Sequence, residues 1–274
     1  MSTWILLRGL ARDSRHWGLL PELLRVAQPG AQVVALDLPG NGRMNSTPSP
    51  TTVAAMADDV RAQLLHLGIA PPYQLLAMSL GGMVAMAWAT SHPDEVAGVV
   101  LINTSGGGLQ PFFRRLRPRA WWPLLRLALP GLSAAQHERI VVRLTSHHHA
   151  EASAEWIAWH QSHPVSLGNA WRQLLAAQRF EVPPEAPRAP LLLLSSARDG
   201  LVDPRCSHSL AHAWQTARAE HPTAGHDLAL DDPAWLVECV RLWQAASAKR
   251  SRPGPVQPFF DACTAETAAR SASR

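Results

Sequence analysis

The feature that most constrains the fold is a short apolar segment that ends at Ser79 and continues as a helical pattern from Leu80. Small residues lie two positions before and two positions after the serine, at Ala77 and Gly81. A serine on so tight a turn from strand to helix has a strained backbone, and only small neighbours leave room for it. The pattern is typical of a nucleophile elbow, in which the helix start aims free N–H groups at an oxyanion. Because small-x-Ser-x-Gly also occurs by chance, the context decides the interpretation.

Strand and helix patterns alternate on both sides of this motif. Compact apolar runs indicate strands over residues 3–7, 32–38, 73–77, 96–103 and 190–196, with a weaker one over 218–221. Helical spacing of apolar residues indicates helices over residues 16–28, 51–67, 81–91 and 233–248, and one more that begins at 204. Such alternation with nearly continuous apolar strands predicts an α/β fold, with a mostly parallel sheet covered by helices on both faces.

The alternation lapses over residues 105–187. This stretch has helical periodicity but no convincing strand, and it divides into segments over residues 119–129, 133–146, 150–163 and 166–180. We therefore predict a core formed by residues 1–104 and 188–248, and an all-helical cap inserted as residues 105–187. After residue 248 the chain reads Lys-Arg-Ser-Arg-Pro-Gly-Pro and loses its periodicity, which predicts a disordered tail over 249–274.

The composition and the N-terminal segment indicate the cellular compartment in which the protein is expected. Of the 274 residues, 47% are hydrophobic and 17% are charged, and no apolar run approaches the roughly 18 residues of a membrane span. The N-terminal segment has neither a basic leader nor an apolar region long enough for a signal peptide, so export is not expected. Cys206, Cys239 and Cys263 are widely spaced and suggest neither a disulfide framework nor a zinc site. We expect a cytoplasmic protein that uses no metal or cofactor.

Three polar residues follow strands of the expected sheet, at the edge where open parallel sheets bind ligands. They are, in chain order, Ser79, Asp199 and His226. A serine hydroxyl becomes a good nucleophile when a histidine takes its proton, and a carboxylate fixes the tautomer of that histidine. The order serine, acid, histidine is the one associated with an elbow carried by a sheet. We take these three residues as the candidate catalytic triad.

Other acidic residues have simpler interpretations. Asp203 and the pair at 231–232 each come directly before a proline, so they fit the cap of a helix with proline in its first turn. Asp227 adjoins His226 in sequence, but neighbouring side chains diverge. Asp199 is therefore the preferred orienting acid.

The chain resembles an α/β-hydrolase with a helical cap over about residues 3–248. The resemblance rests on the loop Arg8-Gly9-Leu10, the turn Asp37-Leu38-Pro39-Gly40-Asn41-Gly42, the elbow, the acid loop beside Gly200 and the pair Gly225-His226. The family usually has His where this chain has Arg8 and Asn41, and Gly where it has Ala77. The resemblance implies that the backbone N–H groups of Leu10 and Leu80 hold the oxyanion. Arg8 is expected to make the mouth of the site more basic than usual.

The expected cap is rich in aromatic residues, which suits an apolar acyl or aromatic group in a pocket beneath it. The candidate pocket residues are Met78, Trp121, Trp122, Trp156 and Trp159. Packing of the cap onto the sheet is the simpler role for most of these tryptophans, and packing under the elbow explains Met78 and Met83 at least as well.

The formal charge of +4 arises outside the core. Arg139 and Arg143 lie four residues apart on one expected helix face, and arginines crowd the start of the cap at 114, 115, 117 and 119. A solvated surface is the ordinary explanation, and recognition of an acidic acyl carrier is the alternative. No interleaving with stacking aromatics supports nucleic-acid binding. The three histidines at 147–149 cannot all face one ion, so we expect a solvated loop there.

These features predict a serine hydrolase that cleaves a carboxylic ester or thioester through an acyl-enzyme on Ser79. Carbon–carbon hydrolysis, amide hydrolysis and perhydrolysis can use the same three residues, and a non-catalytic ligand-binding protein could retain them. The fold alone does not choose among these functions.

Overall fold

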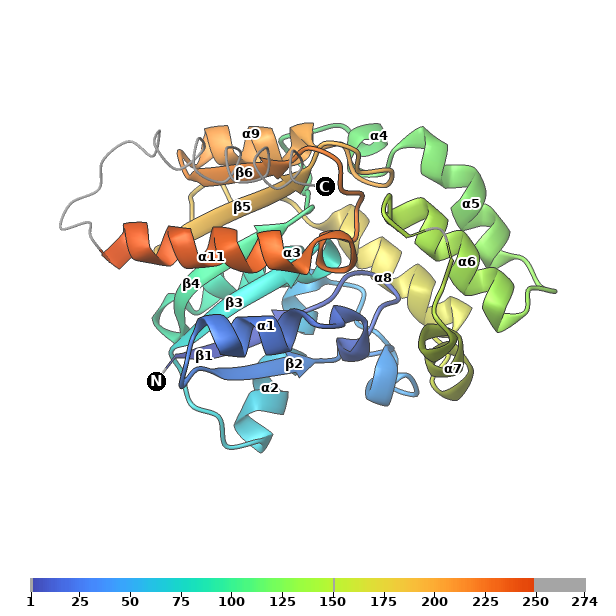
Figure 1. Ribbon diagram of the computed structural model, residues 1–274, viewed down its shortest axis with the longest axis horizontal. Coiled ribbons are helices and arrows are strands. Elements are labelled where there is room, and N and C mark those ends of the chain that lie inside the picture. Colours follow the sequence, from blue (N-terminus) through green and yellow to red (C-terminus); the bar gives the residue numbers. More distant parts are fainter. Residues whose placement is uncertain (1, 150, 249–274) are drawn as a thin grey trace.

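A six-stranded parallel sheet forms the centre of the molecule (Figure 1). The computed structural model describes residues 2–149 and 151–248, so the predicted tail over 249–274 lies outside the described residues. The strands are β1 (Thr3–Leu7), β2 (Gln32–Leu36), β3 (Tyr73–Met78), β4 (Val96–Ile102), β5 (Leu191–Ser196) and β6 (Ala217–His221), in the spatial order β2-β1-β3-β4-β5-β6. The predicted α/β class is confirmed, and the weakest expected strand is present as β6.

Side chains alternate across the sheet and contribute to two separate cores. Along β1, Ile5 and Leu7 belong to one cluster of buried residues, whereas Trp4 and Leu6 belong to the other. The first cluster includes residues of α2 (Val53–His66), α3 (Leu80–Ser91) and α9 (Arg205–Ala213). The second includes residues of α1 (Leu20–Ala27) and α11 (Pro233–Ala248), which lie side by side in Figure 1. All four of these β1 side chains are buried, as expected for a strand covered by helices on both faces.

The helices begin and end where the local sequence permits. Their bounds are α1 (Leu20–Ala27), α2 (Val53–His66), α3 (Leu80–Ser91), α4 (Phe112–Arg115), α5 (Pro118–Ala128), α6 (Ala134–Thr145), α7 (Ala154–Ser162), α8 (Leu167–Arg179), α9 (Arg205–Ala213), α10 (Leu228–Asp231) and α11 (Pro233–Ala248). The Thr52 hydroxyl caps α2 by accepting from the amide of Ala55. Within the described residues no helix has both the length and the apolar character to cross a bilayer.

One expected helix is divided in two. The pattern over residues 16–28 is a short 3-10 turn, Ser14–Trp17, followed by α1. Gly18 separates them with φ of +54°, a left-handed conformation that side-chain-bearing residues rarely adopt. The turn therefore ends there, and a new helix starts near Pro21.

Helices α4–α8 lie between β4 and β5 in sequence, and four of them match the four predicted segments. This stretch, residues 105–187, is called the insertion below. Figure 1 shows α5, α6 and α7 together at one end of the molecule. The insertion bonds to loops at the carboxyl edge of the sheet: the amide of Asp227 donates to the Thr145 carbonyl at 2.7 Å, and the amide of Ser49 to the Asn169 side chain at 2.9 Å. Its status as a separate cap domain stays a prediction.

Candidate active site

Ser79 occupies a strained turn between β3 and α3. Its φ of 55° and ψ of −118° lie outside the regions that non-glycine residues ordinarily occupy. A Cβ at Gly81 would lie 2.4 Å from the carbonyl oxygen of Leu7, and a Cβ at Gly9 would lie 3.0 Å from the Cβ of Ser79. The absence of side chains at both positions lets β1 and its following loop approach the serine closely. The prediction of a tight turn that needs small neighbours is confirmed at Gly81.

The end of β4 holds this turn in place. The Ser79 amide donates to the Ile102 carbonyl at 2.9 Å, and the Thr104 hydroxyl donates to the Ser79 carbonyl at 2.7 Å. A Cβ at Gly82 would lie 2.7 Å from the side chain of Thr104. Ser79 is thus fixed by its neighbouring strand as well as by its own chain.

Asp199 and His226 are hydrogen-bonded partners. The Nδ1 atom of His226 lies 2.7 Å from Oδ2 of Asp199, and both side chains are buried. The other carboxylate oxygen accepts from the amides of Leu201 at 2.7 Å and Val202 at 2.9 Å. Because those amides occupy Oδ1, Oδ2 faces the imidazole, and a proton on Nδ1 leaves Nε2 as the basic atom.

Asn103 joins the histidine loop to the end of β4, although sequence reasoning did not single it out. Its Nδ2 atom donates to the His226 carbonyl at 2.7 Å and to the Ser196 hydroxyl at 3.0 Å, and its Oδ1 atom accepts from the Ser196 amide at 2.9 Å. It has a φ of 46°, which asparagine tolerates better than most residues. The sequence did offer one indication of its role: Asn103 directly follows an apolar strand, at the edge where parallel sheets place their functional residues.

The loop after β1 lies beside Ser79. The amide of Ala11 donates to the Gln173 side chain of α8 at 2.9 Å, and the amide of Arg12 donates to the Gly9 carbonyl at 3.3 Å. Among the described residues, neither the Leu10 amide nor the Leu80 amide donates a hydrogen bond. Their role as donors to an oxyanion stays a prediction.

The expected basic mouth at Arg8 is wrong. Arg8 is buried and donates two hydrogen bonds to Asp227, at 3.0 and 2.6 Å, while its guanidinium lies 4.9 Å from the ring centre of Trp17. Burial raises the pKa of Asp227, but the charge of Arg8 and its hydrogen bonds outweigh burial, so the net pKa lies below its usual value. Asp227 thus neutralises the charge of Arg8. The carboxylate that bonds to the imidazole of His226 is that of Asp199.

Three other acids also have partners away from His226. Asp203 accepts from the amide and guanidinium of Arg205, and this hydrogen bonding lowers the pKa of Asp203 to about 2. Asp232 accepts from the Trp235 amide at 2.9 Å and caps α11 as predicted. The same prediction for Asp231 is wrong, because its carboxylate accepts from the insertion at Ser146, at 2.5 Å, and from the amide of Gly225 at 2.7 Å.

The histidines at 147–149 are exposed, as predicted for a solvated loop. The ring of His148 nevertheless has partners in the core: Nδ1 lies 3.0 Å from the Asp231 carbonyl oxygen, and Nε2 lies 3.2 Å from the Thr223 hydroxyl. This segment therefore helps to attach the insertion to the loop before His226.

The candidate pocket residues lie in different places. Met78 is buried in the core cluster of α1 and α11. Trp121 and Trp122 are 44% and 71% exposed on α5. Trp156 and Trp159 of α7 both make edge contacts with the His16 ring, so they pack on the loop after β1. The structure does not gather these five side chains, and their role as a substrate pocket stays a prediction.

Arginines of the insertion hold the loop that carries Asp199. The Arg117 guanidinium donates to the Asp199 carbonyl at 2.9 Å, and Arg119 donates to the carbonyls of Asp199 and Gly200. The backbone amide of Arg117 also donates to the Leu201 carbonyl at 2.8 Å. Arg119 is exposed and Arg117 is half-buried, so the predicted solvated surface holds for Arg119, and both guanidinium groups also bond to protein carbonyls.

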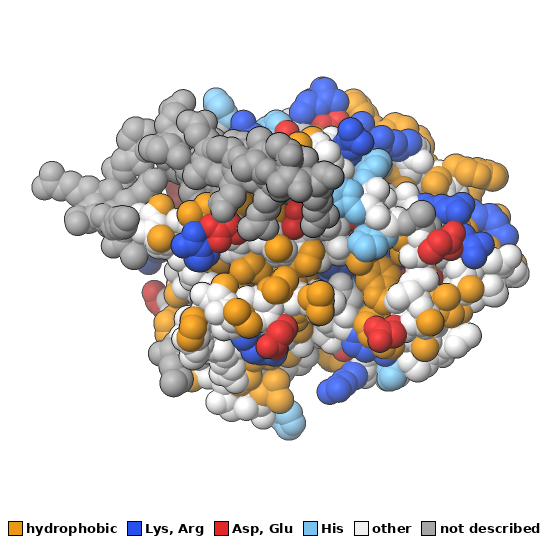
Figure 2. Space-filling model, in the orientation of Figure 1, with side chains coloured by type: hydrophobic (Ala, Val, Ile, Leu, Met, Phe, Trp, Pro, Cys, Tyr) orange, Lys and Arg blue, Asp and Glu red, His pale blue; other side chains and the backbone are white. Residues whose placement is uncertain are grey.

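Four other arginines of the insertion, at 114, 115, 139 and 143, also have partners. Arg114 donates to a glutamine side chain, and Arg115 donates to carbonyls at the end of α8. Arg139 and Arg143 are exposed and share one carboxylate, Glu151, at 2.9 and 3.5 Å. Figure 2 shows basic side chains gathered at the end of the molecule where α5 and α6 lie. This exposed pair also matches the predicted solvated face.

The fold and the site place the chain in a known class. The family model of the alpha/beta hydrolase fold matches residues 5–233, and the chain belongs to this family. It is an α/β hydrolase, as the sequence resemblance implied.

Two curated relatives and one solved structure illustrate the range of the family. A Caulobacter sp. protein with the provisional name carbamate hydrolase RutD is 28% identical over 243 residues, covering 84% of this chain and 86% of the relative. A pimeloyl-[acyl-carrier protein] methyl ester esterase of Chromobacterium violaceum is 40% identical over 93 residues, 32% of this chain and 34% of the relative. The chain thus spans about a third of that relative's length. A thermophilic esterase from Thermogutta terrifontis has a TM-score of 0.65 at 21% identity, covering 90% of each chain, which shows the shared fold.

Proposed function

We propose that the protein is a serine hydrolase that cleaves a carboxylic ester or thioester. The proposal rests on one observation: the residues at the end of β4 form hydrogen bonds with both the proposed nucleophile and the proposed base. Ile102 and Thr104 form hydrogen bonds with the backbone of Ser79. Asn103 donates a hydrogen bond to the backbone carbonyl of His226. His226 is in turn hydrogen-bonded to the carboxylate of Asp199. Acyl transfer by a serine uses a strained, exposed hydroxyl and a histidine paired with a buried acid, and the end of β4 bonds to the backbone of both the serine and the histidine.

The proposed mechanism has two stages. Oγ of Ser79 attacks the substrate carbonyl while Nε2 of His226 takes the hydroxyl proton, and the resulting oxyanion accepts hydrogen bonds from the amides of Leu10 and Leu80. His226 then gives the proton to the departing alcohol or thiol, which leaves an acyl group on Ser79. Water, deprotonated by His226, attacks this ester, and the carboxylic acid is released as His226 returns the proton to Oγ of Ser79. Asp199 holds Nδ1 and stabilises the imidazolium in both stages.

The substrate is proposed to have an apolar acyl part. The name of the Chromobacterium relative concerns an acyl ester on a carrier protein, which supports testing acyl-carrier esters beside small esters. Arg139 and Arg143 are the basic residues to test for such a carrier, because they are exposed and share only one carboxylate. An Arg139→Glu, Arg143→Glu double variant that loses turnover of the carrier ester alone, with strong salt dependence, would support carrier recognition.

The decisive experiment is labelling with a fluorophosphonate probe together with turnover of p-nitrophenyl butyrate. Wild type should be labelled at one serine and should release p-nitrophenol, and Ser79→Ala should do neither. Ser91→Ala is the matched control, because it removes an exposed hydroxyl at the other end of α3 and should behave as wild type. Labelling that persists in Ser79→Ala would remove Ser79 as the nucleophile. Binding of esters without any turnover would favour the non-catalytic alternative.

A further inference from the structure

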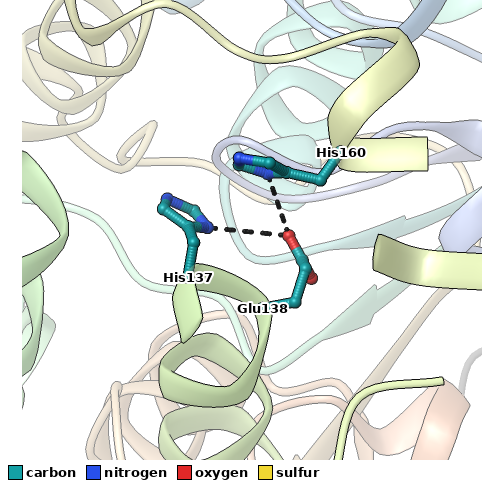
Figure 3. A group of neighbouring side chains, drawn as sticks. All are labelled: His137, Glu138 and His160. Atoms are coloured by element: carbon teal, nitrogen blue, oxygen red, sulfur yellow. Dashed lines mark ion pairs between the residues drawn. The ribbon is translucent and has the colours of Figure 1, made fainter. Parts of the chain in front are cut away.

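Two imidazoles and one carboxylate meet in the insertion, apart from the proposed triad. Figure 3 shows Glu138 and His137 on α6 and His160 on α7, with one carboxylate oxygen facing both rings. This oxygen, Oε1 of Glu138, lies 3.2 Å from Nδ1 of His160 and 3.6 Å from Nδ1 of His137. One ligand-type atom from each residue lies within 4.8 Å of the other two.

Hydrogen bonding accounts for only part of this geometry. A separation of 3.6 Å is too long for an N–H···O bond, and Nδ1 of His137 is buried without a hydrogen-bond partner among the described residues. The two rings have centroids 4.3 Å apart, so charging both would add repulsion between them. A buried nitrogen aimed at an oxygen that it does not reach is therefore unexplained by the protein groups alone.

The separations do fit ligands around one metal ion. Zinc binds imidazole nitrogen and carboxylate oxygen at about 2.0–2.2 Å, so tetrahedral ligand atoms around it lie about 3.3–3.6 Å apart. The observed separations of 3.2 and 3.6 Å are close to this spacing. Imidazole also suits zinc better than it suits magnesium or calcium. We infer that His137, Glu138 and His160 bind one divalent transition-metal ion, with Zn²⁺ as the best match.

The surroundings favour binding through a single carboxylate oxygen. Glu138 is 2% exposed, and its second oxygen, Oε2, accepts from Nη1 of Arg12 at 2.6 Å. Such a bond fixes the orientation of a ligating carboxylate and leaves Oε1 for the metal. The rings of His137 and His160 are 27% and 24% exposed, which gives an ion a route of entry and a water molecule access to a fourth position. The positive charge of Arg12 opposes the metal, so we expect weaker binding than at a closed four-ligand zinc site.

An ion at this position would connect three segments. It would bridge α6 and α7 directly, and through Glu138 and Arg12 it would reach the loop that follows β1. A ligand that binds only the folded state stabilises that state. Metal binding is thus expected to raise the thermal stability of the insertion and its attachment to the core, independently of the proposed hydrolase activity.

The test uses the full chain after dialysis against a chelator. Calorimetric titration with Zn²⁺ should show one site in wild type, and Co²⁺ should give visible absorption bands of a four-coordinate ion. His137→Ala and His160→Ala should each weaken Zn²⁺ binding by at least about tenfold, since losing even an outer partner of a metal ligand costs 10- to 100-fold. His149→Ala, which removes an exposed histidine of the neighbouring run, is the matched control and should bind as wild type.

Thermal unfolding supplies a second measurement. Zn²⁺ should raise the Tm of wild type and of His149→Ala, and the same Zn²⁺ concentration should raise the Tm of His137→Ala and His160→Ala by less. Absence of saturable Zn²⁺ binding by wild type would overturn the inference without reference to any variant. Equal affinity in wild type, His137→Ala and His160→Ala would also overturn it, because the ion would then bind elsewhere, such as at the histidines of 147–149.

Discussion

The guanidinium of Arg8 and the carboxylate of Asp227 form a buried ion pair with two hydrogen bonds, and each side chain is 2% exposed. Arg8 directly follows β1, and Asp227 directly follows His226. The pair therefore connects the loop that carries Leu10 to the loop that carries His226. Removing one partner of a buried pair leaves an uncompensated charge, which is more costly than removing both.

Asp227→Asn and Arg8→Met are each expected to lower the free energy of unfolding by about 3–5 kcal/mol. Asparagine keeps an oxygen for the cap of α10, where Asp227 accepts from the Leu230 amide, so the substitution tests mainly the charge. The double variant should lose less than the sum of the two single losses. Urea unfolding of all four proteins measures this coupling, and strictly additive losses would show that the pair acts as two independent residues.

The same pair predicts a dependence of stability on pH. The pKa of Asp227 is lower in the folded protein than its ordinary value of 3.8, so its contribution is complete above that value and is lost as the pH falls through the folded pKa. Wild type should therefore lose stability below about pH 4 more steeply than the Arg8→Met, Asp227→Asn double variant. The groups whose charges act on this carboxyl are Arg8, Arg12 and His226. Parallel curves for the two proteins in urea unfolding across this range would contradict the prediction.

Asp199 and Asp203 have different partners: Asp199 bonds to His226, whereas Asp203 pairs with Arg205. Asp199→Asn should lower kcat by orders of magnitude, because it disturbs the tautomer of His226 while keeping a similar shape. Asp203→Asn removes a charge paired with Arg205, which is exposed, and keeps an oxygen for the Arg205 amide, so it should lower stability only slightly and change kcat little. Esterase kinetics and thermal unfolding of both variants separate the two roles. The reverse ranking of kcat would transfer the orienting role to Asp203.

Arg119 is expected to position the acid loop without touching the substrate. Arg119→Met removes the donors to the carbonyls of Asp199 and Gly200, and the resulting displacement should lower kcat about 10- to 100-fold. KM should change little, because a positioning effect acts on the catalytic geometry. Arg179→Met is the control, since it removes an exposed arginine of the same insertion that has no proposed role. Equal losses in the two variants would indicate a general effect of charge, and partial recovery in Arg119→Lys would support positioning.

The strands, most helices and the strained turn at Ser79 were predictable from local patterns. Trp4 to Leu7 form an unbroken apolar run because both faces of β1 are covered, and this burial is encoded residue by residue. Ser79 was identifiable because strain at one residue demands small neighbours within two positions. The order of Ser79, Asp199 and His226 needed only the alternation of strands and helices. The break at Gly18 was missed because helical spacing continues across it.

The partners of the polar side chains were decided by the tertiary structure. Arg8 and Asp227 are 219 residues apart, and nothing near either of them in sequence indicates that their charges cancel. Asn103 was overlooked because its role depends on β4 lying between β3 and β5 in the sheet. The spacing of apolar residues predicts which side of a helix or strand is buried, and this spacing is a property of the segment itself. The partner of a buried charge depends on which loops the strand order brings together, and that is fixed only when the whole sheet has formed.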